Sequence, residues 1–440
     1  MRGNAPVEVY MKENEIKTKA VLVGIVTDRA NAEEVEKSVY ELGQLLDTAG
    51  GETFAVVIQN KSTPDPRTLI GKGKVQEIGE LCANNGVKLV VFDEELSPAQ
   101  IRNLEDDIGN DVHVIDRSML ILDIFALHAV SGEGKLQVEL AQLKYSAPRL
   151  IGKGSELSRL GGGIGTRGPG ESKLESDRRH IKRRIVALEE ELEKLANTRK
   201  TMRAARDRSG LKKVAIVGYT NAGKSTLLNY LTDAGILAED KLFATLDPTT
   251  RKFTLPGGET VLLTDTVGFI KKLPHHLVNA FRSTLDEAVY SDIIMIVIDA
   301  SDPEYLSQLE CTEQTLEELG AGDKPILYAF NKCDRGTYDN PIIDRTKERQ
   351  QVVHISAKTG EGCDKLAEML QEIANGGKCS VVFKIPNAEQ GAMHILYRDA
   401  TIEDVDWGAE CVTVKAIVDK KTRGMLKKYD TMLPDEKEDF

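Results

Sequence analysis

A glycine-rich stretch in the middle of the chain has the residue types and spacing of a phosphate-binding loop. It follows an apolar strand pattern at residues 214–217 and precedes a helical pattern with Leu227, Leu228 and Leu231. In this context, backbone N–H groups point inward at a helix N-terminus, where the helix dipole favours phosphate. A chance match of four constrained positions is the alternative, and the flanking strand and helix argue against it. The residues predicted to bind a nucleoside triphosphate are Gly218, Tyr219, Thr220, Asn221, Ala222, Gly223, Lys224, Ser225 and Thr226.

Two residues of this loop are predicted to interact with the phosphate groups and the metal ion. Lys224 can reach the β- and γ-phosphates, and the hydroxyl of Ser225 can coordinate Mg²⁺. Gly218 and Gly223 permit the tight backbone wrap because they lack a Cβ. The loop therefore predicts Mg²⁺ as a cofactor.

Further short segments follow at the ends of other apolar strand patterns, where parallel sheets bind their ligands. Asp265 is predicted to support Mg²⁺ through water, and the N–H of Gly268 to meet the γ-phosphate. Asp334 can accept hydrogen bonds from both N–H donors of guanine, which adenine does not present. Each match is weak alone, but together and in this order they predict GTP binding. The predicted nucleotide-binding residues are Asp265, Thr266, Val267, Gly268, Asn331, Lys332, Cys333, Asp334, Ser356, Ala357 and Lys358.

The region between the loop and Asp265 should supply a threonine that coordinates Mg²⁺ and senses the γ-phosphate. The candidates are Thr245, Thr249 and Thr250, of which Thr245 has the best spacing. The residues around it that we expect at the nucleotide are Phe243, Ala244, Thr245, Leu246 and Asp247. The resulting catalytic set is Lys224, Thr245, Asp265 and Gly268, with Ser225, Thr245 and, through water, Asp265 at the metal.

Phe269 follows Gly268, where Ras-type proteins place the glutamine that orients the attacking water. Because phenylalanine cannot orient water, we expect slow intrinsic hydrolysis unless a partner or a monovalent cation assists. Asn221 occupies the loop position that holds K⁺ in cation-activated relatives. A purely structural role for Asn221 remains equally open, so K⁺ is an expected cofactor only under the first alternative.

The first part of the chain alternates strand and helix patterns, which predicts an α/β unit with a largely parallel sheet. The expected strands are residues 20–26, 53–58, 88–92 and 111–115, and the expected helices are 32–48, 74–84 and 98–108. Ser97 is the predicted N-cap of the last helix. Residues 71–74 contain two glycines and two lysines but lack full phosphate-loop spacing, so we predict a plain loop and helix start.

Two heptad-spaced apolar patterns flank a glycine-rich break. The first comprises Leu136, Leu140, Leu143, Ala147 and Leu150, and the second comprises Ile181, Ile185, Leu188, Leu192 and Leu195. The patterns predict an antiparallel helical hairpin whose second helix spans about residues 172–206. Two core helices of a larger bundle would show the same spacing.

The break and its flanks are basic in a chain whose formal net charge is −12. Residues 144–184 contain eleven Lys/Arg and four acidic residues. A flexible linker is one explanation, but a glycine-rich tip on a basic stem favours contact with RNA phosphates. The candidate RNA-contact residues are Lys153, Arg159, Arg167, Lys173, Arg178, Arg179, Lys182, Arg183 and Arg184.

Length and composition are ordinary for several globular domains, with 41% hydrophobic and 29% charged residues in 440. We expect an α/β subdomain at 1–132, the hairpin at 133–208, a nucleotide domain at 211–376 and a small α+β domain at 380–440. No apolar run is long enough for a membrane span, and no apolar signal-peptide core occurs near the N-terminus, so a cytoplasmic protein is expected. The cysteines show no paired spacing, which argues against a metal or disulfide framework: Cys82, Cys311, Cys333, Cys363, Cys379 and Cys411.

Several of these segments resemble the HflX family of translation-factor-class P-loop GTPases. The resemblance is carried by residues 243–247, 265–269, 120–125 and 134–143, and most specifically by GGGIGTRGPGESKL at 161–174. It spans about residues 20–376, and the last 60 residues carry no motif that matches. It implies an α/β fold, with a P-loop GTPase domain preceded by an α/β domain bearing a long helical hairpin.

The resemblance also implies a function. Such proteins bind the large ribosomal subunit, are stimulated by it and dissociate stalled or idle ribosomes under stress. Expected partners are GTP, GDP and ribosomal RNA, with a monomeric, partly ribosome-associated protein. Some members hydrolyse ATP through the N-terminal domain, which residues 71–74 do not show. The alternatives are an RNA-modification or ribosome-assembly GTPase, or a GTP-binding switch or scaffold in which hydrolysis is incidental.

Overall fold

The chain forms two compact units in the computed structural model. Unit 1 comprises Met1–Arg208, Leu237–Pro248 and Val267–Asp286, and unit 2 comprises Ser209–Ile236, Thr249–Thr266 and Glu287–Phe440. The residues described are 17–28, 31–109, 111–148, 169–207, 211–232, 242–243, 246–272, 282–336, 350–376 and 378–431. Two segments from the second half of the sequence therefore belong to unit 1.

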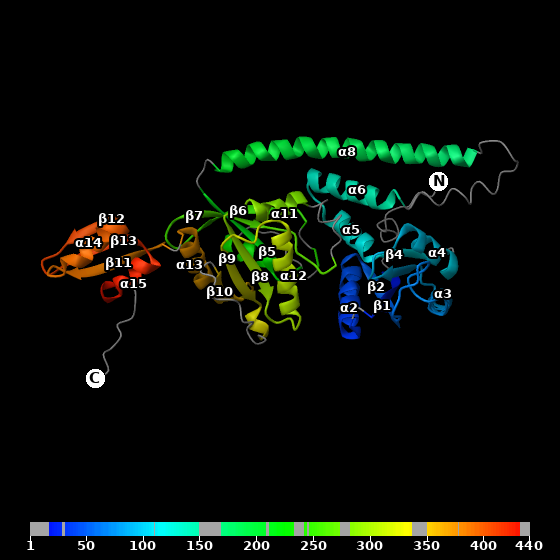
Figure 1. Cartoon of the computed structure of the whole chain (residues 1–440), viewed down its shortest axis with the longest axis horizontal. Helices are drawn as coiled ribbons and strands as arrows, with labels where there is room; N and C mark the ends of the chain where they lie inside the picture. Colours follow the sequence, from blue (N-terminus) through cyan, green and yellow to red (C-terminus); the bar gives the residue numbers. More distant parts are fainter. Residues whose placement is uncertain are drawn as a thin grey trace. The chain divides into compact units, whose positions relative to one another are not determined.

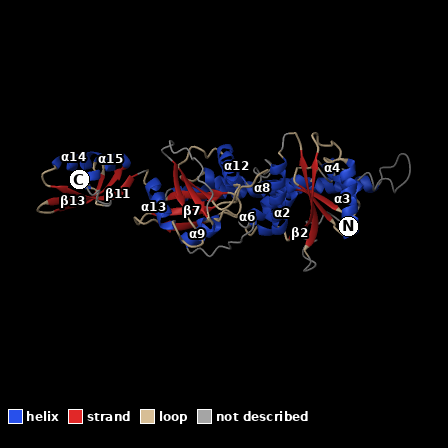
Figure 2. Cartoon of the chain, turned by 90° about the horizontal axis from the view of Figure 1, so that it is seen from below, coloured by secondary structure: helices blue, strands red, loops and turns tan. Residues whose placement is uncertain are grey.

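Unit 1 begins with a four-stranded parallel sheet in the order β2-β1-β3-β4. The strands are β1 (Thr18–Val26), β2 (Gly51–Asn60), β3 (Leu89–Phe92) and β4 (His113–Asp116). The helices that connect them are α2 (Ala32–Thr48), α3 (Lys72–Asn85) and α4 (Pro98–Ile108). Helix α2 lies on one face of the sheet, and α3 and α4 lie on the other (Figures 1 and 2). The parallel strands require these crossover helices.

Local sequence accounts for the helix boundaries. Ser97 caps α4 in a capping box with Gln100, and Pro98 takes the first helical position, where its missing N–H costs nothing. Gly71 is the N-cap of α3, so residues 72–74 form the first turn of an ordinary helix. The plain helix start predicted for residues 71–74 is therefore observed.

Helix α5 (Arg117–His128) follows β4 directly and was not predicted from periodicity. Its residues Leu120, Ile121, Leu122, Ile124 and Phe125 are at most 1% exposed. A helix that is buried on all sides shows no amphipathic period, so the pattern carried no helical signal.

The predicted hairpin pairs α6 (Gly132–Ser146) with α8 (Pro169–Asp207), and α6 also packs on α5. The face of α6 with Gly134, Gln137, Val138 and Ala141 is buried. Of the predicted heptad positions, Leu140 is buried, Leu136, Leu143 and Ala147 are partly buried, and Leu150 lies outside the described residues. Helix α6 is therefore the middle layer between α5 and α8, which Figure 1 shows. The structure combines the two alternatives, because the hairpin is also part of a larger helical core.

Unit 2 contains a six-stranded sheet in the order β10-β9-β8-β5-β7-β6, in which only β6 is antiparallel to its neighbour. Its strands are β5 (Lys212–Gly218), β6 (Thr249–Thr254), β7 (Thr260–Asp265), β8 (Ile293–Asp299), β9 (Ile326–Asn331) and β10 (Gln350–His354). Its helices are α9 (Lys224–Thr232), α12 (Tyr305–Glu318), α13 (Cys363–Ala374) and the 3-10 turn η2 (Cys333–Arg335). Helix α11 (Arg282–Val289) precedes β8. Leu227 and Leu228 of α9 and Leu366 and Leu370 of α13 pack in one apolar core beneath the sheet.

The C-terminal part is a three-stranded antiparallel sheet in the order β11-β13-β12. Its elements are β11 (Lys378–Pro386), α14 (Gln390–Asp399), β12 (Thr401–Trp407), β13 (Cys411–Asp419), α15 (Lys420–Met425) and η3 (Lys427–Tyr429). The predicted fold class is confirmed. Among the described residues, no helix is long and apolar enough to cross a membrane.

Replacing Leu188 by alanine should loosen the hairpin. Leu188 is fully buried in α8, and a Leu→Ala change in a core costs about 2–5 kcal/mol. Val186, two residues earlier, is 53% exposed, so Val186→Ala should change the stability by about 0.5 kcal/mol or less. Hydrogen exchange of the α6 and α8 amides in the full chain measures both. Equal protection in the two variants would contradict this packing.

Candidate functional site

The loop after β5 is held so closely by its neighbours that two positions admit only glycine. Gly218 has φ +149, and a Cβ there would lie 2.2 Å from the carbonyl oxygen of Val297. Gly223 has φ +94, and a Cβ there would lie 2.3 Å from Nδ2 of Asn331. The loop backbone therefore takes the conformation expected of a phosphate cradle before α9 begins at Lys224.

Lys224 lies folded into this loop. Its Nζ donates to the carbonyl oxygens of Gly218 at 3.2 Å and Tyr219 at 2.8 Å. Burial lowers the pKa of Lys224 to about 8, Asp265 acts to raise it, and Lys332 lowers it further. A phosphate group at the loop would supply the negative charge that stabilises the protonated amine.

Two of the residues predicted to serve Mg²⁺, Ser225 and Asp265, meet beside the loop, and the third, Thr245, lies outside the described residues. The hydroxyl of Ser225 donates to Oδ2 of Asp265 at 2.7 Å, and Asp265 is fully buried. Thr266 donates through Oγ1 to the carbonyl oxygen of Ile216 at 2.8 Å, which holds the end of β7 on β5. A hydroxyl and a buried carboxylate at the N-terminus of α9 are the hard oxygen ligands that Mg²⁺ prefers. The residues present therefore fit this ion.

Thr220 provides a further indication that a polar ligand belongs here. Its side chain is 6% exposed, and among the described residues its Oγ1 has no hydrogen-bond partner. Buried polar atoms in native structures are nearly always paired. The hydroxyl is available to a ligand of the loop.

The predicted base-recognition residues come together at the ends of β9 and β10. Asn331 donates to the carbonyl oxygen of Ala222 at 2.8 Å and accepts from the N–H of Ala357 at 2.9 Å. Asp334 accepts from the hydroxyl of Ser356 at 2.7 Å, and this hydrogen bond lowers the pKa of Asp334. Asp334 is thus an ionised acceptor, and Asn331 ties its segment to the phosphate loop.

The remaining residues of this region occupy supporting positions. Lys332 has φ +66 and forms an ion pair with Asp299 at 2.7 Å, whereas the side chain of Lys358 is exposed. Cys333 lies in η2, where burial raises the pKa of its thiol.

Of the other predicted nucleotide residues, Phe243, Leu246, Asp247, Val267 and Gly268 belong to unit 1. Ala244 and Thr245 lie outside the described residues, whereas Thr249 and Thr250 are in β6. Asp247 accepts from the N–H groups of Val130 at 3.0 Å and Ser131 at 2.7 Å, directly before α6.

Two aromatic residues of the same segments are also buried in unit 1. The ring of Phe243 packs edge-on against Phe125 with centroids 4.8 Å apart. Phe269, at the position of the missing glutamine, is 1% exposed. Phe243 and Phe269 are therefore buried side chains of unit 1.

Sequence reasoning missed Lys272, Asp93 and Arg117, which form a charged cluster in unit 1. Lys272 follows the γ-phosphate motif closely, and two consecutive lysines after the apolar pair Phe269-Ile270 are the signal that could have drawn attention to it. The partners could not have been found from spacing, because they come from distant parts of the chain.

Comparison with known proteins identifies the family. Family models match residues 36–126 (GTP-binding GTPase N-terminal), 128–206 (GTP-binding GTPase Middle Region) and 213–332 (50S ribosome-binding GTPase). GTPase HflX of Escherichia coli (strain K12) is 41% identical over 421 residues, covering 91% of this chain and 97% of that protein. GTPase HflX of Lacrimispora saccharolytica is 50% identical over 404 residues, covering 92% and 94%. The chain belongs to the HflX family.

As a member of the HflX family, the protein is a GTPase that binds guanine nucleotides, which confirms the resemblance and the enzyme class predicted from sequence. A solved structure of a GTP-binding protein from Sulfolobus solfataricus in complex with GDP is also similar, at 27% identity and a TM-score of 0.44. It covers 82% of this HflX-family chain and 99% of its own.

Asp334→Asn should reverse the base preference. The amide no longer accepts from both N–H groups of guanine but can donate to the extra carbonyl of xanthine. We expect GTP affinity to fall about 100-fold or more, with XTP bound more tightly than GTP. Titration calorimetry with both nucleotides measures this, and Asp364→Asn, at an exposed position in α13, is the control. Unchanged GTP affinity in Asp334→Asn would exclude its role at the base.

Proposed function

We propose that this HflX-family GTPase binds the large ribosomal subunit in its GTP state, dissociates stalled or idle ribosomes and leaves after hydrolysis. The observation that carries this proposal is the basic surface of α8. Arg178, Arg179, Lys182 and Arg183 are all exposed near the end of the helix that adjoins the glycine-rich segment. A cluster of exposed cations in an acidic chain favours an RNA-phosphate partner.

Not every predicted RNA contact is equally available. Arg184 forms a bidentate pair with Glu139 of α6, with both N–O distances at 2.7 Å, and so contributes to the hairpin itself. Both side chains are 42% exposed, which limits the value of the pair to about 1 kcal/mol or less. Lys153, Arg159 and Arg167 lie outside the described residues, and Lys173 lies in α8.

In the proposed mechanism, Lys224 and the N–H of Gly268 bind the γ-phosphate, while Asn331 and Asp334 select guanine. Ser225, Thr245 and, through water, Asp265 would hold Mg²⁺, which neutralises charge on the β- and γ-phosphates. Phenylalanine at position 269 cannot orient the attacking water, so slow intrinsic hydrolysis is expected. The ribosomal partner, or a K⁺ ion at Asn221, would supply the missing alignment.

Sedimentation of ribosomes with the full chain tests the proposal directly. With GTP or a non-hydrolysable analogue, the protein should cosediment with large subunits and reduce the fraction of joined ribosomes, and with GDP it should do neither. Subunits should also stimulate GTP turnover. Equal binding with GTP, GDP or no nucleotide would refute the proposal. Absence of stimulation would favour a switch or scaffold.

Charge reversal on α8 provides a matched test of the RNA surface. The double substitution Lys182→Glu with Arg183→Glu should weaken large-subunit binding about 10-fold or more and flatten its salt dependence, because phosphate contacts are lost. Lys194→Glu, at another exposed lysine on the same helix, should remain within about twofold of wild type. Equal losses in both variants would indicate a general charge effect and would contradict a specific surface.

A further inference from the structure

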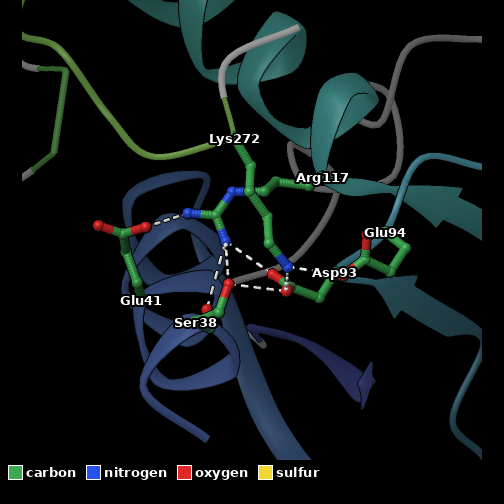
Figure 3. Close-up of polar contacts among 6 residues, drawn as sticks. All are labelled: Ser38, Glu41, Asp93, Glu94, Arg117 and Lys272. Atoms are coloured by element: carbon green, nitrogen blue, oxygen red, sulfur yellow. Dashed lines mark hydrogen bonds and ion pairs between the residues drawn. The ribbon is translucent and has the colours of Figure 1, made fainter. Parts of the chain in front are cut away.

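A cluster of charged side chains in unit 1 joins three parts of the N-terminal sheet domain to the segment that follows Gly268. Figure 3 shows its members, which are Ser38, Glu41, Asp93, Glu94, Arg117 and Lys272. Ser38 and Glu41 lie on α2, Asp93 and Glu94 follow β3, and Arg117 begins α5. Lys272 alone comes from the distant segment.

The centre of the cluster is a buried ion pair. Arg117 and Asp93 are each 2% exposed, and Nη1 of Arg117 lies 2.7 Å from Oδ1 of Asp93. Arg117 also donates to the carbonyl oxygen and the hydroxyl of Ser38, both at 3.3 Å, and forms an ion pair with Glu41. The hydroxyl of Ser38 donates to Asp93 at 2.7 Å. Such a centre is stable only when its charges are fully compensated.

Lys272 supplies the compensation. Its Nζ lies 2.5 Å from Oδ2 of Asp93 and 2.6 Å from Glu94. Without Lys272, Arg117 would be the one cation among these six residues, beside the carboxylates of Glu41, Asp93 and Glu94. A second cation is therefore favourable at this site. Burial by itself would lower the pKa of Lys272, but Asp93 and Glu94 outweigh it and raise that pKa. Burial likewise acts to raise the pKa of Asp93, and Arg117 and Lys272 more than reverse it.

The backbone around Lys272 is unusually constrained. Lys272 has φ +56, a left-handed conformation that non-glycine residues adopt only when their surroundings enforce it. Phe269 and Ile270 are 1% and 2% exposed, so the residues between Gly268 and Lys272 are packed. On the other side, Thr266 is bonded to Ile216 of β5 in unit 2. Along the chain, Gly268 therefore follows closely on a residue held in unit 2 and precedes residues packed in unit 1.

We propose that Lys272 is a positioning residue for Gly268, and that the Lys272–Asp93–Arg117 cluster couples the γ-phosphate to unit 1. A triphosphate whose γ-phosphate accepts a hydrogen bond from the N–H of Gly268 is linked, through the backbone from Gly268 to Lys272, to the ion pair between Lys272 and Asp93. The hairpin belongs to the same unit, so the cluster is the route by which the nucleotide reaches the proposed ribosome-binding surface. The inference rests on the role of Gly268 in the proposed function.

The test compares the affinities for GDP and for a non-hydrolysable GTP analogue, measured by calorimetry on the full chain with Mg²⁺. If the contact between Lys272 and Asp93 differs in strength between the GDP state and the analogue state, then by linkage its removal must change the two nucleotide affinities by different factors. The ratio of the affinities therefore measures the coupling. Lys272→Met keeps the length of the side chain and removes its charge, while Asp93 retains Arg117. We expect the ratio to shift at least about fivefold. A ratio within about twofold of wild type overturns the proposal.

Three further variants separate positioning from structural damage. Lys272→Arg keeps the charge and should restore the ratio to within about twofold of wild type. Lys17→Met removes an exposed lysine–aspartate pair with Asp47 in the same unit, 2.7 Å long, and should leave the ratio unchanged. Adding Asp93→Asn to Lys272→Met should shift the ratio no further than Lys272→Met alone. Equal loss of both affinities, with no change in their ratio, would show a merely structural role and overturn the proposal.

Hydrogen exchange provides a second readout that involves no ribosome. In the wild type, amides of α2 and of the segment after β3 should differ in exchange between the GDP state and the analogue state. In Lys272→Met, this difference should disappear, and its persistence would overturn the proposal. Because neither measurement includes ribosomal subunits, failure of subunit binding and failure of this coupling are distinguishable.

Discussion

The nucleotide site depends on the close approach of the phosphate-binding loop to its two neighbours. Gly218 lies against the carbonyl oxygen of Val297 on β8, and Gly223 lies against the side chain of Asn331. A side chain at either position would displace the loop by more than a van der Waals contact can absorb. The same closeness lets Asn331 hydrogen-bond to Ala222, so one residue links the base-recognition segment to the phosphate loop.

Burial then determines the electrostatics of this site. Lys224 and Asp265 are both almost inaccessible, and burial of the amine lowers its pKa to about 8. Each charge is costly in isolation, which makes the site favourable for a ligand that brings compensating charges of both signs. A nucleoside triphosphate with Mg²⁺ is such a ligand. The loop geometry and the buried charges therefore favour the same kind of ligand.

Unit 1 contains the two segments that are predicted from sequence to sense the nucleotide state. Phe243 packs on Phe125, Asp247 accepts from the backbone before α6, and Lys272 bridges Asp93 and Glu94. Phe243 and Lys272 both adopt left-handed backbone conformations. Strain of this kind persists only where surrounding contacts outweigh it. The segments predicted to sense the nucleotide thus belong to the same unit as the helical hairpin.

Most of the regular elements were predictable because their signals are local. The capping box at Ser97 and the strand patterns around Asp265 and Asn331 each depend on neighbouring residues. Helix α5 was not predictable, since burial on every side removes the amphipathic period. The second buried face of α6 was missed because it exists only through its contact with α5.

The sequence alone determined the nucleotide chemistry. Phosphate loop, guanine motif and family signature are contiguous runs, and their function follows from residue type and spacing. Only the tertiary structure decided which unit holds the segments around Thr245 and after Gly268. The contact of Lys272 with Asp93 spans 179 residues. No periodic sequence pattern encodes a pairing at that separation. The pair forms only when the fold places the two distant segments side by side.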